Sequence, residues 1–530
     1  MSSHARRLLP FALLAVAVLT GASSATARRA AAPTLVVDNS FALDTTDPQR
    51  EFDPTSAIID HAVYESMFTY EGDDIAHPVP LLVKSWTSDR ARTFTFRLKR
   101  NIHFADGTPL TSADVVFSLT RLANLHGPKS TLFTGNMVSA KDRYTVVVKT
   151  AVPQPQLAAV LANPATGIVN SRLVEQHGGS AAPDASTTDT AESWFNSTSS
   201  VGAGTGPYAL ASYDPSSQVT LRRNPRYWGA NKPQFGAIVI RNMSAPAQLL
   251  NIRRGSHQIA IDLSPAQAET LKGDKRLRVA QQPSVFTFYA FTNEDPAIST
   301  ATSNKRFQQA FREALDYHGA VSVAGPGAIQ APGVIPSTIP GALPQQDAAK
   351  QNLQKARADL AASGVGAEQL TLEYPSDVTF TGVSFATLAQ KLLPDLSAAG
   401  FHVTLSGSPV ATFQARYRAA KAALGLWIYG PVYPDPSDYL SFVPGGFVAS
   451  HVNWNVGSDP TVDRLAARAR ATTGRAARAS LYQQIQRALN ERGPFMPLVQ
   501  PAVVLVATDD LAGVVYNSVI GIDITQLSPK

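Results

Sequence analysis

Strand-like and helix-like segments alternate along almost the whole chain, and this alternation limits the possible fold more than any other feature. From about Thr34 onward, runs with a two-residue apolar period are interleaved with runs whose apolar residues recur at helical spacing. The strand-like runs include 93–99, 219–223, 237–241, 285–291, 371–374, 401–405, 424–429 and 502–506. The helical runs include 307–315, 347–363, 384–399, 460–471 and 480–492. The pattern predicts an α/β fold, and 530 residues are enough for two or three globular units.

The N-terminal segment has the organisation of a secretory signal peptide. Three basic residues precede an apolar run over 8–19, and Ala25-Thr26-Ala27 is a small-x-small cleavage site. An uncleaved membrane anchor is the alternative, but a membrane span needs about 20 apolar residues and Pro10 interrupts this run. The pair Arg6-Arg7 points to twin-arginine export, although its neighbours fit that signal poorly. We therefore predict a signal peptide over 1–27, cleaved near Ala27, and a periplasmic or secreted protein.

The composition excludes several classes of function. The chain contains no cysteine, which rules out disulfides, zinc–thiolate sites, thiol catalysis and a lipid-modified cysteine anchor. The net charge is +6, and no basic block like those of nucleic-acid-binding proteins stands out. The charge therefore indicates a solvated surface, and we predict no nucleic-acid partner.

One segment differs from its surroundings in composition. Between His177 and Gly206 the chain consists mainly of Gly, Ser, Thr and Ala, apart from Trp194 and Phe195. Such composition is typical of loops, so the segment is predicted to be a surface loop or linker.

Eight short motifs follow one another in an order that is more informative than any one of them. They are Tyr64–Met67, Pro80–Trp86, Thr93–Lys99, Phe104–Ser118, Gly204–Tyr208, Asn224–Gly229, Arg306–Phe311 and Pro434–Pro436. In this order they resemble the solute-binding protein family 5 of ABC importers, which includes periplasmic dipeptide- and oligopeptide-binding proteins. The resemblance covers almost the whole mature chain, and the run 104–118 is its most specific part. These motifs are mainly turn, cap and packing chemistry, so they indicate the fold rather than the ligand.

The resemblance implies a particular architecture and mechanism. It implies a two-lobed periplasmic-binding-protein fold of type II, in the large peptide-binding subclass, with a hinge of two crossing strands. Lobe I would comprise 33–285 plus 500–530, with an extra subdomain over about 65–205, and lobe II would comprise 286–499. The lobes would close around a small solute or short peptide by a population shift. The protein would then act as a monomer that delivers this ligand to the permease subunits of an ABC transporter in the membrane.

The resemblance also indicates where a ligand would bind. In peptide-binding relatives, cleft strands offer backbone N–H and C=O groups to an extended ligand. One such edge would lie over 39–44, with Phe41, Ala42 and Leu43, and the other over 424–430. The side chains of Trp427, Tyr429 and Tyr433 could form pockets beside the second edge, with ordinary core packing as the alternative for each.

The chain departs from the family pattern at one position that matters for the ligand. Peptide-binding relatives commonly carry an aspartate three residues after the strand tryptophan, and it pairs with the α-amino group of the ligand. That position is Gly430 here, or Val432 if the following turn is aligned instead. A buried ammonium without a counter-charge is unfavourable by several kcal/mol. Either Asp435, Asp438 or Asp44 supplies the charge, or the ligand is a blocked or modified peptide, or a non-peptide solute such as an oligosaccharide.

Catalytic signatures are missing from the sequence. It contains no His-Glu-x-x-His pair, no Gly-x-Ser-x-Gly elbow and no Gly-x-x-x-x-Gly-Lys loop, and 202–206 resembles a phosphate loop only superficially. The ten histidines are scattered, and His402 and His451 are interpreted as surface or structural residues. We predict no enzyme, no cofactor and no metal site. A polysaccharide-active enzyme is the rival hypothesis, with Asp435 and Asp438 as its only candidate carboxylates.

Overall fold

The computed structural model of the protein describes residues 32–41 and 43–530. The predicted signal peptide over 1–27, with its cleavage site, lies outside these residues. Within the described part of the chain, no helix is both long enough and apolar enough to cross a membrane.

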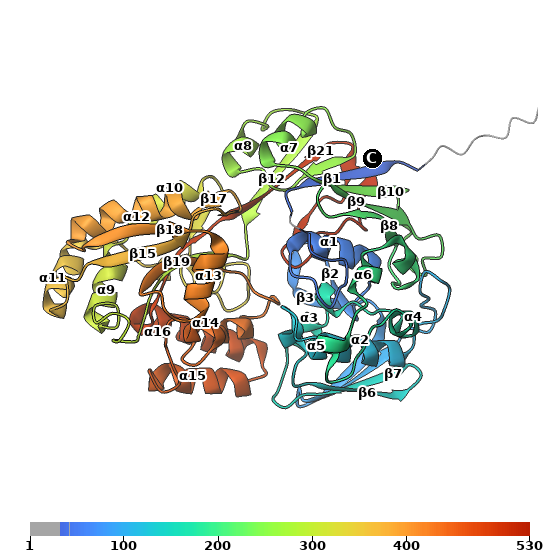
Figure 1. The fold of residues 1–530 in the computed structure, drawn as a ribbon, viewed down its shortest axis with the longest axis horizontal. Coiled ribbons are helices and arrows are strands. Elements are labelled where there is room, and N and C mark those ends of the chain that lie inside the picture. The colour runs from blue at the N-terminus through green and yellow to red at the C-terminus, as the bar shows by residue number, and fades with distance from the viewer. Residues whose placement is uncertain (1–31, 42) are drawn as a thin grey trace, which may run out of the picture.

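The protein has two lobes, which lie side by side in Figure 1. The first lobe is built on a seven-stranded sheet in the order β12-β21-β11-β1-β10-β9-β8. Its strands are β1 (Thr34–Asn39), β8 (Tyr208–Asp214), β9 (Gln218–Arg223), β10 (Ala237–Asn242), β11 (Gln258–Ala260), β12 (Leu277–Pro283) and β21 (Ala502–Thr508). The helices that contact this sheet are α1 (Pro54–Val63), α7 (Ala245–Ile252) and α8 (Pro265–Glu269). Strand β1 runs parallel to both β10 and β11, as in an α/β sheet.

A second, antiparallel sheet of the first lobe lies at the bottom right of Figure 1. Its order is β4-β5-β7-β6, and β5 buries Phe94, Phe96 and Leu98 on one face, which confirms the predicted alternation. The strands are β4 (Val83–Asp89), β5 (Thr93–Leu98), β6 (Met137–Asp142) and β7 (Thr145–Lys149), beside the hairpin of β2 (Phe68–Glu71) and β3 (Asp74–Pro80). The helices of this region are α2 (Ser112–Asn124), α3 (Leu157–Val160), α4 (Ser171–Gln176), α5 (Ala185–Thr188) and α6 (Glu192–Phe195).

The second lobe is built on a six-stranded sheet in the order β14-β20-β13-β19-β15-β18. Its strands are β13 (Thr287–Thr292), β14 (Ile329–Gln330), β15 (Leu370–Pro375), β18 (Val403–Ser408), β19 (Leu424–Tyr429) and β20 (Phe495–Gln500). One face packs against α9 (Lys305–Ala314), α10 (Tyr317–Ala324), α11 (Leu353–Ser363) and α12 (Phe385–Ala399). The other face packs against α13 (Val410–Arg418), α14 (Phe447–Ser450), α15 (Pro460–Ala471) and α16 (Arg475–Arg492). The predicted two-lobed α/β fold is therefore confirmed.

Short hairpins complete the described chain. They are β16 (Thr379–Phe380) with β17 (Val383–Ser384), β22 (Leu511–Ala512) with β25 (Ser528–Pro529), and β23 (Tyr516–Asn517) with β24 (Gly521–Ile522).

Two extended connections link the large sheets. Strand β12 continues through 284–286 into β13, and β20 continues through Pro501 into β21. The connections lie side by side, because β12 pairs with β21 and β13 pairs with β20, both antiparallel. They are also bonded to each other: the Ser284 N–H donates to the Pro501 carbonyl at 2.8 Å, and the Gln500 amide donates to the Ser284 carbonyl at 2.5 Å. Gln500 is fully buried, and its side-chain oxygen also accepts from the Ser337 N–H at 3.1 Å.

The segment 177–206 is exposed over most of 177–190, as predicted, but it is more than a loop, because it contains short helices and its last part is buried. It contains α5, α6 and a 3₁₀ turn (Thr198–Gly202), and both Trp194 and Phe195 are buried. Its anchor is Asp189, whose carboxylate accepts hydrogen bonds from Arg121 at 2.7 and 2.9 Å. A composition of small polar residues does not reveal such an anchor, because one buried carboxylate is enough to hold the segment against α2.

Arg121 itself is fully buried and binds three partners. Its guanidinium forms a fork to Asp47, with distances of 2.7 and 2.6 Å, and a second fork to Asp189. It also donates to the Gln49 side chain at 2.7 Å and lies over the Phe195 ring at 5.2 Å. Both carboxylates are fully buried, so this cluster neutralises charges that water does not reach. It ties the segment after β1 to α2 and to 177–206.

The motifs of the first lobe that carry the resemblance serve the scaffold, as predicted. In the turn before α2, Gly107 has a φ of +94°, which favours glycine. At the start of α2, the Asp114 carboxylate accepts from the backbone N–H of Thr111 at 2.9 Å, which closes the predicted cap. These residues shape the lobe and do not contact the other lobe's strands.

Three of the motifs converge on one buried carboxylate, that of Glu65. It accepts hydrogen bonds from the Thr205 hydroxyl at 2.8 Å, the Tyr227 hydroxyl at 3.0 Å and the Trp228 indole at 2.6 Å. Burial raises the pKa of Glu65 to about 7 in spite of these donors. Residues that are distant in sequence thus share one polar centre, which explains why the motifs occur together.

Candidate ligand-binding site

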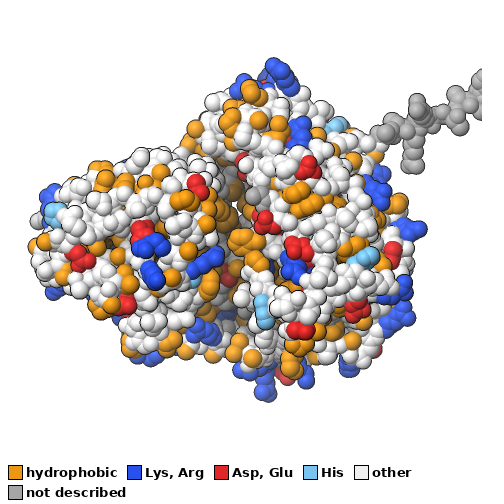
Figure 2. Space-filling model, in the orientation of Figure 1, with side chains coloured by type: hydrophobic (Ala, Val, Ile, Leu, Met, Phe, Trp, Pro, Cys, Tyr) orange, Lys and Arg blue, Asp and Glu red, His pale blue; other side chains and the backbone are white. Residues whose placement is uncertain are grey.

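A groove runs between the two lobes in the space-filling view (Figure 2). The lobes touch across it. The Asn163 amide of the first lobe donates to the Val432 carbonyl of the second at 2.7 Å, and Arg475 lies 2.6 Å from the His77 ring nitrogen. A cavity of about 190 Å³ lies at this contact, lined by β3 and α3 on one side and by 434–436 and α16 on the other. The loop after β19 therefore lies at the boundary between the lobes.

Strand β19 has one open side over part of its length. It pairs with β13 along all six residues, but the β15 ladder reaches only Leu424 and Gly425. The strand is thus internal at its start, which corrects the expectation that all of 424–430 forms an edge. Its second half, 426–429, is not paired with β15, so the backbone groups on that side have no strand partner; Leu426 and Ile428 are buried, whereas Trp427 and Tyr429 are partly exposed.

Trp427 lies in this second half and is half-buried. Its ring stacks on Phe385 with centroids 5.7 Å apart and contacts Phe413 at 5.2 Å and Tyr417 at 6.2 Å. The indole therefore forms part of an aromatic cluster and also lines a small cavity. The structure therefore shows the packing role, while the role of Trp427 in ligand binding stays a prediction.

Tyr429 and Tyr433 are held by partners within the protein. The Tyr429 hydroxyl donates to Asp438 at 2.7 Å, and its ring packs edge-on against Tyr439 and Phe442. Burial raises the pKa of Tyr429 well above its usual value. The Tyr433 hydroxyl lies 3.2 Å from the Ser437 hydroxyl. Tyr429 reaches the same small cavity as Trp427, whereas Tyr433 packs on the turn that follows.

Gly430 cannot be replaced by a residue with a side chain without a rearrangement. A Cβ atom at this position would lie 2.2 Å from the ring of Phe286, which itself packs against Phe380 at 5.0 Å. The ring of Phe286 thus occupies the space that a side chain at 430 would need. An aspartate at 430 would therefore require this ring to move.

Neither nearby aspartate is a free counter-charge. Asp435 forms a fork with Arg478, at 3.0 and 2.5 Å, and accepts from the Ser437 N–H at 2.9 Å, where it caps the 3₁₀ helix η5 (Pro436–Phe442). Asp438 is held by the Tyr429 hydroxyl and the Val432 N–H, and burial raises its pKa to about 7. Asp435 is therefore already neutralised, and burial of Asp438 favours its protonated form more than in an ordinary aspartate.

The first predicted edge, 39–44, does not have the expected free backbone. The Phe41 N–H donates to the Asn242 side chain at 3.1 Å, and the Phe41 carbonyl accepts from the same amide at 2.9 Å. Leu43 is a core residue of the first lobe, 4% exposed, and Ala42 lies outside the described residues. Phe41 and Leu43 therefore do not present the free groups that this prediction requires, because Asn242 takes the place that an extended ligand would occupy.

Sequence reasoning missed the residues that complete the cavity beside Trp427. This aromatic pocket, as we call it, has a volume of about 90 Å³ and lies between β19, α13 and α14. It is also lined by Tyr289, Gln414, Tyr417, Arg418, Phe447, Val448 and His451. His402 is a surface residue and His451 is buried at 8% exposure, which fits the expected surface or structural roles, and His451 also lines the pocket. No sequence pattern links these positions, since they come from separate elements.

Comparison with known proteins decides the family. The model of the bacterial extracellular solute-binding proteins, family 5, matches residues 77–448. The chain belongs to this family. It is 26% identical over 500 residues to the probable D,D-dipeptide-binding periplasmic protein DdpA of Escherichia coli (strain K12), covering 91% of each chain. It is 24% identical over 533 residues to the di/tripeptide-binding protein 2 of Pseudomonas aeruginosa (strain UCBPP-PA14), covering 94% of each.

A solved structure supports the fold of this family 5 protein. The ABC transporter substrate-binding protein CtaP of Listeria monocytogenes superposes with a TM-score of 0.79 at 20% identity, covering 94% of this chain and 99% of the other. Members of the family are transport binding proteins rather than enzymes, and family membership implies an extracytoplasmic location.

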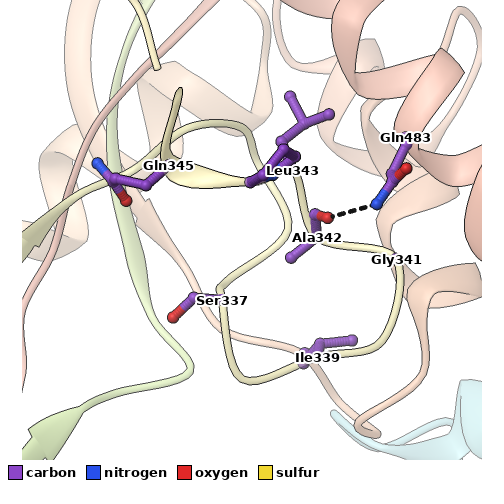
Figure 3. Close-up of a pocket in the computed structure, with 8 residues that line it drawn as sticks. Ser337, Ile339, Gly341, Ala342, Leu343, Gln345 and Gln483 are labelled. Carbon is purple, nitrogen blue, oxygen red and sulfur yellow. Dashed lines mark hydrogen bonds between the residues drawn. The ribbon is translucent and has the colours of Figure 1, made fainter. Parts of the chain in front are cut away.

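A larger hollow of this solute-binding protein lies elsewhere on the second lobe. Its volume is about 460 Å³, and it is formed by the loop 337–345 and Gln483 of α16, whose amide donates to the Ala342 carbonyl at 3.0 Å (Figure 3). It shares no lining residue with the aromatic pocket. Apart from Ser337 and two glutamines its lining is apolar or glycine, so it offers no charged group to a ligand.

Proposed function

We propose that this family 5 protein captures a peptide or peptide-like solute between its lobes and delivers it to the permease of an ABC importer. The observation that carries this proposal is that β15 leaves the second half of β19 unpaired, beside the interlobe contact at Val432 and at the position of Trp427. An extended ligand placed there gains backbone hydrogen bonds along 426–429 and an aromatic surface for its side chains. The protein binds and releases this solute without chemical change and acts as a monomer.

The same proposal includes the lobe boundaries and the location. Lobe I comprises 33–285 plus 500–530, lobe II comprises 286–499, and the region over about 65–205 is the extra subdomain. The connections at 284–286 and Pro501 then form the hinge, which is supported by the way the strands pass from one sheet to the other. The exported protein begins near residue 28 after cleavage near Ala27, which N-terminal sequencing of secreted material would check.

Closure of the lobes gives the first testable prediction. Addition of a peptide that binds the protein should lower its radius of gyration, measured by small-angle X-ray scattering. Ligand contacts to both lobes favour the closed state. Mass spectrometry of material that co-purifies with the protein identifies the peptide to use. A ligand that binds in calorimetry without changing the scattering curve would contradict a role as an interlobe receptor, and turnover of that ligand would favour an enzyme.

The second prediction concerns the N-terminus of the ligand. Phe286 covers Gly430 and Arg478 neutralises Asp435, so an α-ammonium finds no charged partner in either place. We therefore expect N-acetylated peptides to bind at least as tightly as the same peptides with free N-termini in calorimetry. An oligosaccharide is the second candidate ligand, favoured by the same missing counter-charge.

Asp438 provides the control for this prediction. Among the three candidate aspartates, Asp438 and the exposed Asp44 have no cationic side-chain partner among the described residues, and Asp438 is the one that lies beside β19. If free peptides bind at least tenfold better than acetylated ones and Asp438→Asn removes that preference, Asp438 pairs with the ammonium. That result would contradict the prediction while leaving the role in peptide capture intact.

A further inference from the structure

The aromatic pocket beside Trp427 has the size of a chain end rather than of a whole ligand. Its volume of about 90 Å³ equals about three water molecules at roughly 30 Å³ each. In Figure 1, α13 and α14 lie on the side of the second lobe that is next to the first. Phe447 lines the pocket and is 70% exposed, so a ring at the edge of the pocket is available to cover a bound group. A ligand along β19 can therefore place one small group here.

Two polar groups of the pocket, the side chains of Arg418 and His451, have no partner among the described residues, whereas the hydroxyls of Tyr289, Tyr417 and Tyr429 are already hydrogen-bonded. The exposed side chain of Arg418 forms no hydrogen bond or ion pair with any residue that the structure describes, in contrast to Arg416 on the same helix, which forks to Glu373 at 2.6 and 2.9 Å. The Nδ1 atom of His451 is buried and, among the described residues, has no hydrogen-bonding partner. A buried polar atom left unpaired costs about 1–3 kcal/mol, so a ligand that satisfies it gains affinity.

The charges around the pocket favour an anion. Burial and the neighbouring Arg418 lower the pKa of His451 to about 4, so its ring is neutral at pH 7 and can donate from one nitrogen. Among the pocket's described lining residues Arg418 is the permanent charge, and the remaining walls are aromatic, aliphatic or amide. A guanidinium pairs well with a carboxylate, whereas a cationic group would be repelled.

We propose that the aromatic pocket binds a carboxylate end of the solute, with Arg418 as its ion-pair partner, His451 as a hydrogen-bond donor and the rings of Trp427 and Phe447 against the adjoining carbon atoms. This assignment rests on the proposed function and narrows it. The expected solute is then a peptide-like acid with a blocked N-terminus and a free carboxylate. This carboxylate is either the C-terminus or part of a short acidic side chain.

The test is calorimetry with three probes: N-acetyl-Ala-Ala, its C-terminal amide, and N-acetyl-Ala-Glu amide. The wild-type protein should bind at least one of the two acids at least tenfold more tightly than the neutral amide. Arg418→Gln should abolish that preference. Arg416→Gln removes the same charge from the same helix, two residues away and so on a different face, and should keep the preference. Comparison of the two acids identifies whether the carboxylate is terminal or on a side chain.

The outcomes separate the two levels of the proposal. If the wild type binds these probes and Arg418→Gln retains the preference for the acid, the assignment of the pocket is wrong while peptide capture stands. If the wild type binds all three probes equally, the carboxylate does not enter a cationic pocket and the assignment is again wrong. If it binds none of them, both the pocket assignment and the peptide-like ligand class are contradicted. Unchanged thermal midpoints of both variants show that they are folded.

Discussion

Replacement of Arg121 by alanine should destabilise the first lobe by about 3–5 kcal/mol, the largest effect that we expect from a single substitution. The change removes the guanidinium that forks to Asp47 and Asp189, both of which are fully buried. Removal of one partner from a buried ion pair is costly on this scale, because the two carboxylates lose their buried counter-ion and keep only the partly exposed Arg50. The loss of stability should exceed the contribution of the lost hydrogen bonds alone, because two negatively charged carboxylates are left close to each other.

Hydrogen exchange measured by mass spectrometry would localise this effect. Protection should fall in α2 and in the segment 177–206, which depends on Asp189 for its attachment. Arg50→Ala is the matched control, because Arg50 also approaches Asp47 and Asp189, at 3.5 and 3.1 Å, but is 23% exposed. Arg50→Ala should lower the free energy of unfolding by much less than Arg121→Ala. Equal effects of the two substitutions, or a loss below about 1 kcal/mol for Arg121→Ala, would show that the cluster is not the anchor described above.

The dependence of stability on pH should change strongly when Glu65 is replaced by glutamine. The pKa of Glu65 is raised from 4.5 to about 7, so between these pH values the folded protein binds more protons at this site than the unfolded chain. Stability from this group is therefore present at low pH and is lost as the pH rises through 7. A shift of this size corresponds to about 3 kcal/mol. The amide of the Glu65→Gln variant is neutral at every pH. The free energy of unfolding of the variant, relative to that of the wild type, should therefore rise by about that amount between pH 4.5 and pH 8.

The comparison with wild type is needed because other groups titrate in the same window. The pKa of His61 is raised by Asp523 against the effect of burial, so its contribution is lost with rising pH as well. His451, whose pKa is lowered by burial, acts in the opposite direction below pH 6.5. Glu175→Gln, at an exposed position, is the control and should leave the profile unchanged. If thermal melts give wild type and Glu65→Gln parallel curves of stability against pH, Glu65 is ionised in the folded protein over this range.

Local patterns predicted the elements well where a cap or an apolar period marks both ends. The helix over 460–471 has the predicted bounds, because Asp459 caps it and Pro460 occupies its first turn. The strand over 424–429 also has the predicted bounds. In contrast, α16 begins at Arg475 rather than at 480, since its first turn carries no side-chain cap that a sequence pattern could detect.

The site was less predictable because it depends on contacts between distant segments. The missing counter-charge at Gly430 was visible in the sequence, but the ring of Phe286 that fills the space beside it lies 144 residues away, just before the neighbouring strand. The occupation of the Phe41 backbone by Asn242 could not be deduced, because any polar side chain in the fold can compete for such groups. Arg418 and His451 were missed for the same reason: only the packing of α13 and α14 on β19 brings them together.

The bonding between the two interlobe connections limits the kinds of motion open to the molecule. Since Gln500 joins both connections and also reaches Ser337, the two strands cannot slide past each other or twist separately without breaking buried hydrogen bonds. In the proposed hinge, bending of both connections together is the motion that keeps these bonds. The two connections are thereby coupled, so a change in one strand is passed directly to the other.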